Sequence, residues 1–391
     1  MSKILDMLLD FTQQGYSSEE IKKAVIDTIC PFYNHPEKAT QYWGCAEMLS
    51  VFEFLIRYHY EPEFKEGLIE VLSMYKTAVE MNAERTFSII CDTLFDFSQK
   101  ENMMWTVREN VKQINDEDFD EKIINYMKHI GDTLEIGTKH IVLELWALMQ
   151  LTNGVVPDYD KIQKLDFGVV IQNILDKQKL VPILMTPPLA LKLSDWRNIA
   201  YHHTYRIMDE HQIMCTYGKK QSSFNISESD LTQYVHKIVR SSNILNIARC
   251  IFVFDYDEQI GNYRSNSSRQ SIRFRSPILE NRLRISMLSQ SFFLDSIVEE
   301  PQLVVATVTD ILNDGKLTKE RAHVRYIHAS QFLFNLWSTY KKELLQIKYF
   351  SAEQKLVFTC GVSGNVCEKI DSGEKELSYM AQYVSFDFCK S

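Results

Sequence analysis

Residues 122–154 read KIINYMKHIGDTLEIGTKHIVLELWALMQLTNG and have the clearest periodicity in the chain. Apolar side chains recur there at helical spacing. They are Ile123, Met127, Ile130, Leu134, Ile141, Leu145 and Leu148. Asn153 and Gly154 follow this run and are residues that favour the C-terminus of a helix. The pattern predicts one long helix over 122–152.

Three further helices are expected downstream of this one. The apolar segment 167–176 predicts a short helix, and the prolines of segment 182–188 then impose an extended connection. Ser194 and Ser227 are the expected N-caps of two more helices, which are separated by a polar loop. We therefore expect a bundle of four helices over 122–255, a size that supports a core of its own.

The N-terminal flank is also expected to be helical. Residues 1–115 read as consecutive helices, and Ser17 with Glu20 has the spacing of a capping box. The acidic run 115–121 is the first candidate boundary and is typical of a solvated linker.

The C-terminal flank has a different texture. Residues 256–284 are rich in Arg and Ser and are interpreted as a connecting segment, whereas 285–391 predict a small α+β domain. The expected elements of that domain are a strand over 303–310, a turn at Asn313–Gly315, a helix over 320–341 and hairpin strands over 344–350 and 355–362. The predicted fold class is mainly α, with a helical N-terminal region, a central bundle and this α+β domain.

The composition excludes several classes of protein. The chain has 391 residues, of which 45% are hydrophobic and 24% charged, as in ordinary globular proteins. No apolar run reaches the ~18 residues of a membrane span, and we expect no signal peptide. The eight cysteines include no C-x-x-C pair. They predict reduced thiols in a cytoplasmic protein, with no zinc site and no cofactor.

The net charge of −9 is unevenly distributed. Residues 1–130 hold 13 basic and 23 acidic side chains, a net of −10. Residues 131–260 hold 13 and 15, a net of −2, and residues 261–391 hold 17 and 14, a net of +3. The acidic excess lies in the first third, so the rest of the chain is compatible with a phosphate-bearing partner.

The sharpest local motif is SDWRNIAYHH, residues 194–203. Arg197 and His202 are five helical positions apart, a turn of ~500°, so Arg197 must lean across to share a ligand with His202. A guanidinium grips phosphate, and an imidazole exchanges protons near neutral pH, so the pair suits RNA cleavage by 2′-hydroxyl attack without a metal. The same spacing also arises by chance, with Arg197 as a surface ion-pair donor and His202 as a partly buried hydrogen bonder.

Residues 122–250 resemble the higher eukaryotes and prokaryotes nucleotide-binding (HEPN) superfamily. The resemblance is carried by the order of the helices and by the Arg-polar-…-His motif at Arg197, Asn198 and His202. It implies an all-helical domain and a metal-independent endoribonuclease of the kind found in phage defence, abortive infection and toxin systems. Arg197 would grip phosphate, His202 would act as acid and base, and Asn198 would orient them. Two chains would face each other to build one composite cleft, which implies a homodimer.

The neighbours of the motif have alternative roles. Tyr201 and Tyr205 would support the site or stack a base, or else pack in the core, and Arg206 would contact phosphate or pair with Asp209 or Glu210. His203, His323 and His328 are interpreted as spectators or structural residues. The candidate RNA-binding cations are Lys219, Lys220, Arg264, Arg269, Arg273 and Arg275. For the arginines, which precede Arg282 and Arg284, a solvated linker is an equally good interpretation.

The expected partner is therefore RNA, with restraint by a regulatory protein or a phage-derived trigger and with no membrane. The N-terminal region would sense that trigger, and the C-terminal domain would bind substrate or a partner. Two other classes stay open. One is a catalytically silent nucleotide-binding or protein-interaction scaffold. The other is a toxin neutralised by a partner that modifies Tyr201 or Tyr205.

Overall fold

The computed structural model describes residues 3–111, 118–209, 212–265, 274–312 and 319–389. Contacts among them divide the chain into two compact units. The helical unit comprises Pro31–Lys38 and Phe54–Phe274, and the sheet unit comprises Met1–Cys30, Ala39–Glu53 and Arg275–Ser391. The chain is 65% helical, which confirms a mainly α protein with a C-terminal sheet. None of the described helices is both long and apolar enough to cross a membrane.

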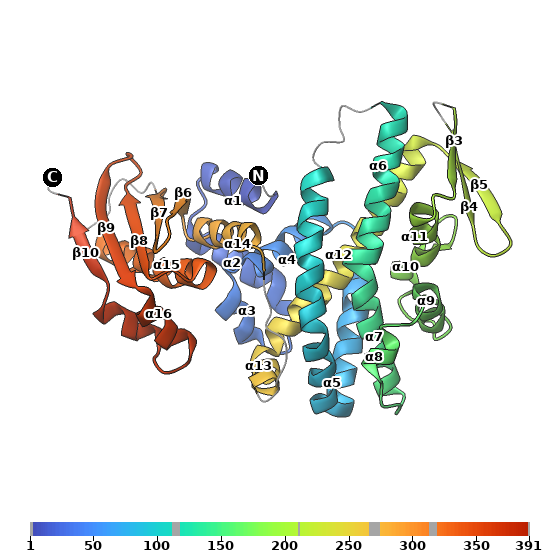
Figure 1. Cartoon of the computed structure of the whole chain (residues 1–391), viewed down its shortest axis with the longest axis horizontal. Helices are drawn as coiled ribbons and strands as arrows, with labels where there is room; N and C mark the ends of the chain where they lie inside the picture. Colours follow the sequence, from blue (N-terminus) through green and yellow to red (C-terminus); the bar gives the residue numbers. More distant parts are fainter. Residues whose placement is uncertain (1–2, 112–117, 210–211, 266–273, 313–318, 390–391) are drawn as a thin grey trace. The chain divides into compact units, whose positions relative to one another are not determined.

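The core of the helical unit consists of long helices. They are α5 (Pro62–Val111), α6 (Phe119–Asp132), α7 (Lys139–Thr152) and α12 (Glu228–Asp255). α5 bends at Asn82, where φ is −161° and ψ is 91°. It packs against α7 and α12 and buries Phe64, Leu68, Tyr75 and Ile90. Figure 1 shows α5 running beside the rod formed by α6 and α7.

The predicted helix over 122–152 is interrupted. Its middle six residues, Thr133–Thr138, form a π-helical segment, η3, in which each bond spans one residue more than in an α-helix. The backbone N–H of Lys139 donates to the carbonyl of Leu134, and the Thr138 hydroxyl donates to the carbonyl of Thr133 at 3.0 Å. Periodicity did not reveal this break, because the buried stripe continues on both sides of it.

The N-terminal residues do not form the one region that the sequence predicted. Residues expected to form one helical region over 1–115 are shared between the two units, and the longest helix, α5, belongs to the helical unit. The physical reason is that the apolar face of α5 is buried against α7 and α12. A sequence pattern marks such a face but not its partner.

Short elements complete the helical unit. The helices are α8 (Tyr159–Ile162), α9 (Phe167–Leu175), α10 (Val181–Leu184), α11 (Leu193–Tyr201) and α13 (Asp257–Ser265). The strands are β1 (Met185–Thr186), β2 (Leu191–Lys192), β3 (Tyr205–Asp209), β4 (Gln212–Tyr217) and β5 (Ser222–Ile226). β3, β4 and β5 form an antiparallel sheet where a polar loop was predicted, so that prediction was wrong. The helix ends before His202, and His203 turns the chain with φ of +51°.

The sheet unit is built on five strands in the order β10-β9-β8-β7-β6. They are β6 (Phe292–Glu299), β7 (Leu303–Asp310), β8 (Leu344–Phe350), β9 (Leu356–Ser363) and β10 (Ser385–Phe388). β7 and β8 are parallel and the other neighbours are antiparallel. The predicted strand 303–310 and the predicted hairpin are confirmed, whereas β6 and β10 were missed. The predicted turn Asn313–Gly315 lies outside the described residues.

Helices cover the core of this sheet, which includes Phe292, Phe332, Ile347 and Phe358. The helices of the C-terminal part are α14 (Ser276–Leu288), α15 (Lys319–Tyr340), α16 (Gly364–Asp371) and η4 (Leu377–Gln382). The N-terminal helices are α1 (Lys3–Gln13), α2 (Ser18–Ile29), η1 (Cys30–Phe32), α3 (Pro36–Tyr42) and α4 (Ala46–Arg57). The predicted helix 320–341 is α15. α13 and most of α14 lie within 256–284, which was predicted to be a connecting segment. α14 starts with Ser276 and Pro277, and Pro is favoured in the first turn of a helix.

Candidate functional site

The motif helix α11 is anchored by its buried face. Trp196 is fully buried, its indole N–H donates to the Thr186 hydroxyl at 2.7 Å, and its ring lies 4.8 Å from that of Tyr234. The N-cap is Lys192, whose backbone N–H donates to Asp195 at 3.1 Å. The predicted N-cap, Ser194, is instead a buried residue of the first turn. α11 therefore starts two residues earlier than the sequence indicated, and its register is fixed by Trp196.

Arg197 is held in place by two hydrogen bonds. Its Nε donates to Oε2 of Glu135 at 2.9 Å, and its Nη1 donates to Oδ1 of Asn198 at 3.1 Å. The guanidinium carbon also lies 5.3 Å from the centre of the Tyr201 ring. The side chains of Arg197 and Glu135 are 23% and 25% exposed, so the pair is partly desolvated. The structure thus brings Arg197, Asn198 and Tyr201 together, with Glu135 as a partner that the sequence did not indicate.

Glu135 lies in the π-helical segment and forms ion pairs with two cationic side chains. Lys139 donates to its Oε1 at 2.7 Å, while Arg197 occupies Oε2. Burial acts to raise the pKa of Glu135, but the charges and hydrogen bonds of Lys139 and Arg197 outweigh it and hold the pKa below its ordinary value. Glu135 is therefore an ionised carboxylate at neutral pH. π-helical turns occur frequently at functional sites. This turn marks Glu135 as a candidate site residue, and the helical periodicity of the sequence did not predict it.

Helix α6 packs closely against α11 next to Arg197 and Glu135. A Cβ at Gly131 would lie 3.2 Å from the Tyr201 ring, so a larger residue there would require Tyr201 to shift. The Tyr201 hydroxyl donates to Asp132 at 3.4 Å. Burial raises the pKa of Asp132, and burial together with the Asp132 charge raises the pKa of Tyr201. Tyr201 is 40% exposed, so it lines the surface beside Arg197 and is not a core residue.

His202 lies at the exposed end of the same helix. It is the C-cap of α11, and its backbone N–H donates to the carbonyl of Asn198 at 3.0 Å. In the part of the chain that the structure describes, its ring nitrogens make no hydrogen bond. Arg197 thus lies in α11 and His202 is the C-cap just after its last residue, with no direct contact between their described side chains. An exposed imidazole and a fixed guanidinium are available to an external ligand.

The other predicted site residues are dispersed. Tyr205 and Arg206 lie in β3, so the helical spacing assumed for them was wrong. Burial raises the pKa of Tyr205, whose ring lies 6.1 Å from that of His203. Lys219 and Lys220 are exposed at the turn between β4 and β5. The side chains of Asp209 and Glu210, the alternative ion-pair partners of Arg206, lie outside the described part.

The arginine segment does not form one continuous arm. Arg264 lies in α13, and Arg275 precedes the first residue of α14. Within the sheet unit, Arg282 pairs with Glu47 at 2.8 Å and Arg284 with Glu280 at 2.8 Å, in ion pairs that are partly buried like that of Arg197 with Glu135. Arg269 and Arg273 lie outside the described residues.

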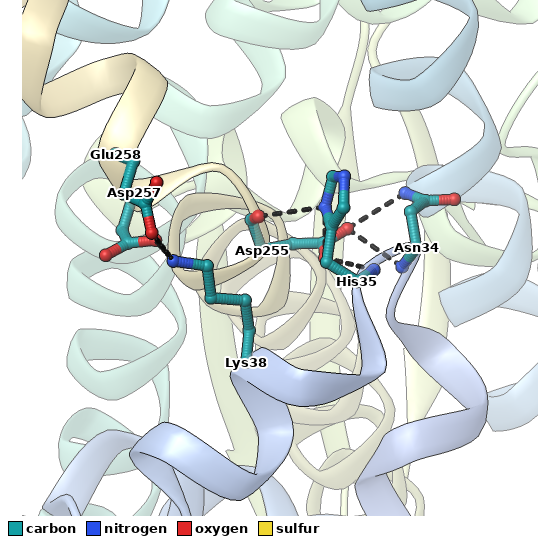
Figure 2. Close-up of polar contacts among 6 residues, drawn as sticks. All are labelled: Asn34, His35, Lys38, Asp255, Asp257 and Glu258. Atoms are coloured by element: carbon teal, nitrogen blue, oxygen red, sulfur yellow. Dashed lines mark hydrogen bonds and ion pairs between the residues drawn. The ribbon is translucent and has the colours of Figure 1, made fainter.

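A second polar cluster is centred on Asp255 and was not indicated by the sequence (Figure 2). This carboxylate is 2% exposed and accepts hydrogen bonds from the backbone N–H groups of Asn34 and His35 at 2.9 and 2.8 Å. The Asn34 amide and Nδ1 of His35 bind it as well, at 2.9 and 3.1 Å. Nearby, Lys38 bridges two carboxylates. The cluster therefore ties segment 31–38 to the end of α12, and Asp255 is already saturated with donors.

A third cluster lies inside the helical unit. The side chains of Glu144 and Arg249 are 1% and 3% exposed and form an ion pair, with both Glu144 oxygens within 3.1 Å of Arg249 Nε. Tyr75 donates to Glu144 at 2.5 Å, Thr93 also donates to it, and Arg249 lies 4.3 Å from the Phe97 ring. These contacts join α5, α7 and α12, so the cluster is part of the core.

The described residues contain no group of three or more His, Cys, Asp and Glu side chains arranged to hold a metal ion. Comparison of the chain with protein-family models, curated proteins and solved structures finds no match.

Proposed function

We propose that this protein is an endoribonuclease that cleaves RNA by attack of the ribose 2′-hydroxyl, without a metal. The observation that carries the proposal is a short helix with a fixed guanidinium, Arg197, and an exposed imidazole, His202, at its C-cap. Both groups suit phosphodiester chemistry, and the buried face of the helix at Trp196 holds their backbone in one register.

In the proposed reaction, an imidazole accepts the proton of the 2′-hydroxyl, and the 2′-oxygen forms a bond to phosphorus. The bond from phosphorus to the 5′-oxygen then breaks, a second acid gives that oxygen a proton, and a 2′,3′-cyclic phosphate remains. Arg197 has five N–H donors, and Glu135 and Asn198 use two of them. The remaining donors would bind the phosphate oxygens, whose negative charge increases in the transition state.

In an in-line displacement the 2′-hydroxyl and the 5′-oxygen lie on opposite sides of the phosphorus, so one His202 cannot reach both at once. The proposal therefore includes a homodimer with a composite cleft. The resemblance to the HEPN superfamily suggests a role as a regulated toxin or an effector of antiviral defence. In that role, a protein or a phage-derived trigger would control a ribonuclease that otherwise harms its host.

A catalytically silent nucleotide-binding or scaffold module is the second candidate. The observation that favours it is the ion pair between Arg197 and Glu135, because a guanidinium that is already neutralised can be purely structural. The two functions differ in the role of His202. A nuclease needs its imidazole for proton transfer, and a scaffold does not.

The deciding experiment is incubation of RNA with the wild-type chain, with His202→Ala and with Arg197→Ala, all in EDTA. We expect the wild type to give products that end in a 2′,3′-cyclic phosphate and each variant to lose at least ~10²-fold in rate. His203→Ala is the matched control, since it removes the adjacent exposed imidazole. RNA left intact by a dimeric wild-type chain would favour the scaffold. Wild-type cleavage that EDTA abolishes, or equal loss in His203→Ala, would contradict the proposal.

A further inference from the structure

The sheet that follows the motif has two different faces. Tyr205, Cys215 and Phe224 are directly opposite one another in neighbouring strands, and so are Ile207, Ile213 and Ile226. Ile213 and Cys215 are fully buried, and the Phe224 ring lies 5.9 Å from that of Trp196. This inner face therefore packs on α11 and fixes the sheet to the motif helix.

Side chains alternate along a strand, so the residues between these rows project from the opposite, outer face. Arg206, Met214 and Asn225 form one cross-strand row there, and Thr216 and Ser223 form the next. Arg206, Asn225 and Ser223 are exposed, and Met214 and Thr216 are half-buried. The outer face thus presents Arg206 with the neutral hydrogen-bond donors Asn225 and Ser223, beside the exposed Met208 of β3.

The described side chains of this sheet carry positive charge. Among its described side chains, 205–208 and 212–226, the ionisable cations are Arg206, Lys219 and Lys220, and no carboxylate is present. Arg206 makes no ion pair within the described residues. By sequence, Asp209 ends β3 and Glu210 follows it, so the three cations give segment 205–226 a net charge of +1. The outer row that joins the Arg206 cation to the neutral donor Asn225 is complementary to a phosphate backbone.

The sheet also begins within two residues of the motif residue His202. Thr204 already belongs to the pairing of the sheet, since its carbonyl accepts from the Thr216 N–H at 2.7 Å and its hydroxyl donates to the Thr216 carbonyl at 2.6 Å. Only His203 separates it from His202. Two residues of extended chain span at most ~7 Å, so His202 lies at the edge of this sheet.

We infer that the outer face of β3, β4 and β5 binds the backbone of single-stranded RNA and leads the strand to His202. This inference rests on the proposed function. Arg206, Lys219 and Lys220 would bind phosphates, and Asn225 would donate to a sugar or base. The aromatic rings of the sheet, Tyr205, Tyr217 and Phe224, lie on the inner face, so affinity would depend mainly on charge and little on base stacking.

The test measures binding separately from cleavage. The probe is a labelled single-stranded 2′-O-methyl oligonucleotide of about 12 residues, which has no 2′-hydroxyl to attack and is followed by fluorescence anisotropy. For the full chain, we expect Arg206→Ala to weaken binding about fivefold. It should also lower the slope of log K against log salt by about 0.7, the value for one phosphate contact on a single strand. The double variant Lys219→Ala/Lys220→Ala should lower the slope by about 1.4.

Lys177→Ala/Lys179→Ala is the matched control, because these two lysines are exposed in the same unit but lie beyond the end of α9. It should leave affinity and slope unchanged. Equal weakening by the control, an unchanged slope in Arg206→Ala, tighter binding of a matched duplex, or no binding by the wild type would each overturn the inference.

Parallel cleavage assays on unmodified RNA separate the two claims. If the sheet variants lose binding while His202→Ala and wild type leave RNA equally intact, the binding face stands and the nuclease proposal fails. If the wild type cleaves RNA and the sheet variants bind and cleave as it does, the nuclease stands and the binding face fails.

Discussion

Arg197 differs from an ordinary surface arginine in the way that its neighbours hold it. Glu135 binds its Nε at 2.9 Å and Asn198 binds its Nη1 at 3.1 Å, while Tyr201 covers one side of the guanidinium. Such a side chain has lost its rotational freedom before any ligand arrives, which reduces the cost of binding phosphate.

A double-mutant cycle tests whether Glu135 holds Arg197. For Glu135→Ala and Arg197→Ala, we expect a coupling of about 1 kcal/mol in the free energy of unfolding, the upper range for pairs that keep some solvent exposure. Urea denaturation followed by circular dichroism gives the value. The control cycle, Glu135→Ala with Arg206→Ala, should be additive. Additivity in the first cycle would mean that Arg197 is not held.

His140 is the residue whose protonation the fold opposes most clearly. It is buried, and among the described residues its ring nitrogens have at most a weak hydrogen bond, to the backbone of Ile136. Burial, with the charges of Arg249 and Lys100, lowers the pKa of His140 from 6.5 to about 3. Between these values the unfolded chain binds a proton that the folded chain rejects. The stability is complete above about pH 6.5 and falls as the pH decreases towards 3.

This linkage predicts the effect of removing the imidazole. Between pH 7 and pH 5, wild type should lose about 2 kcal/mol more unfolding free energy than His140→Phe, given 1.36 kcal/mol per pKa unit. Urea denaturation at the two pH values measures the difference. Parallel pH dependence in the two proteins would show that His140 can be protonated within the fold.

At the scale of elements, the buried pair of Glu144 and Arg249 connects α7 to α12 and reaches α5 through Thr93. Removing one partner of such a pair leaves an uncompensated charge in the core, which costs more than the pair itself contributes. The three helices therefore depend on both residues together.

Arg249→Met should destabilise the helical unit by about 3–5 kcal/mol, because Glu144 then keeps its charge without a cation. The double variant Glu144→Leu/Arg249→Met should recover a large part of that loss, since no buried charge remains. Both are measured by urea denaturation at pH 7. If the double variant were less stable than the single one, hydrogen bonds from Tyr75 and Thr93 would outweigh the charge.

Local signals predicted many elements well. Ser17 with Glu20 and Ser227 with Asp230 form capping boxes, and α7 ends at Thr152 with Asn153 as its C-cap. The strand over 303–310 and the following hairpin show clear β-type alternation. The sheet at 205–226 was missed because its strands are short and begin directly after a helix, without the Gly or Pro that usually marks such a change.

At the scale of the whole molecule, the proposed cleavage needs two copies of α11. We expect the chain to have twice its 45.8 kDa mass in solution, and its specific activity to fall on dilution as the dimer dissociates. Light scattering coupled to size exclusion measures the mass. A monomer that cleaves RNA at full rate would contradict the composite cleft, although it would leave the chemistry of Arg197 in place.

The sequence by itself determined the mainly helical class, the caps and the position of the motif, because these depend on residues within about four positions of one another. Only the tertiary structure decided that α5 packs against α7 and α12. It also placed Glu135 against Arg197, 62 residues away, and Asp255 against His35, 220 residues away. Such contacts depend on which buried faces meet, and a periodic pattern defines a face without naming its partner.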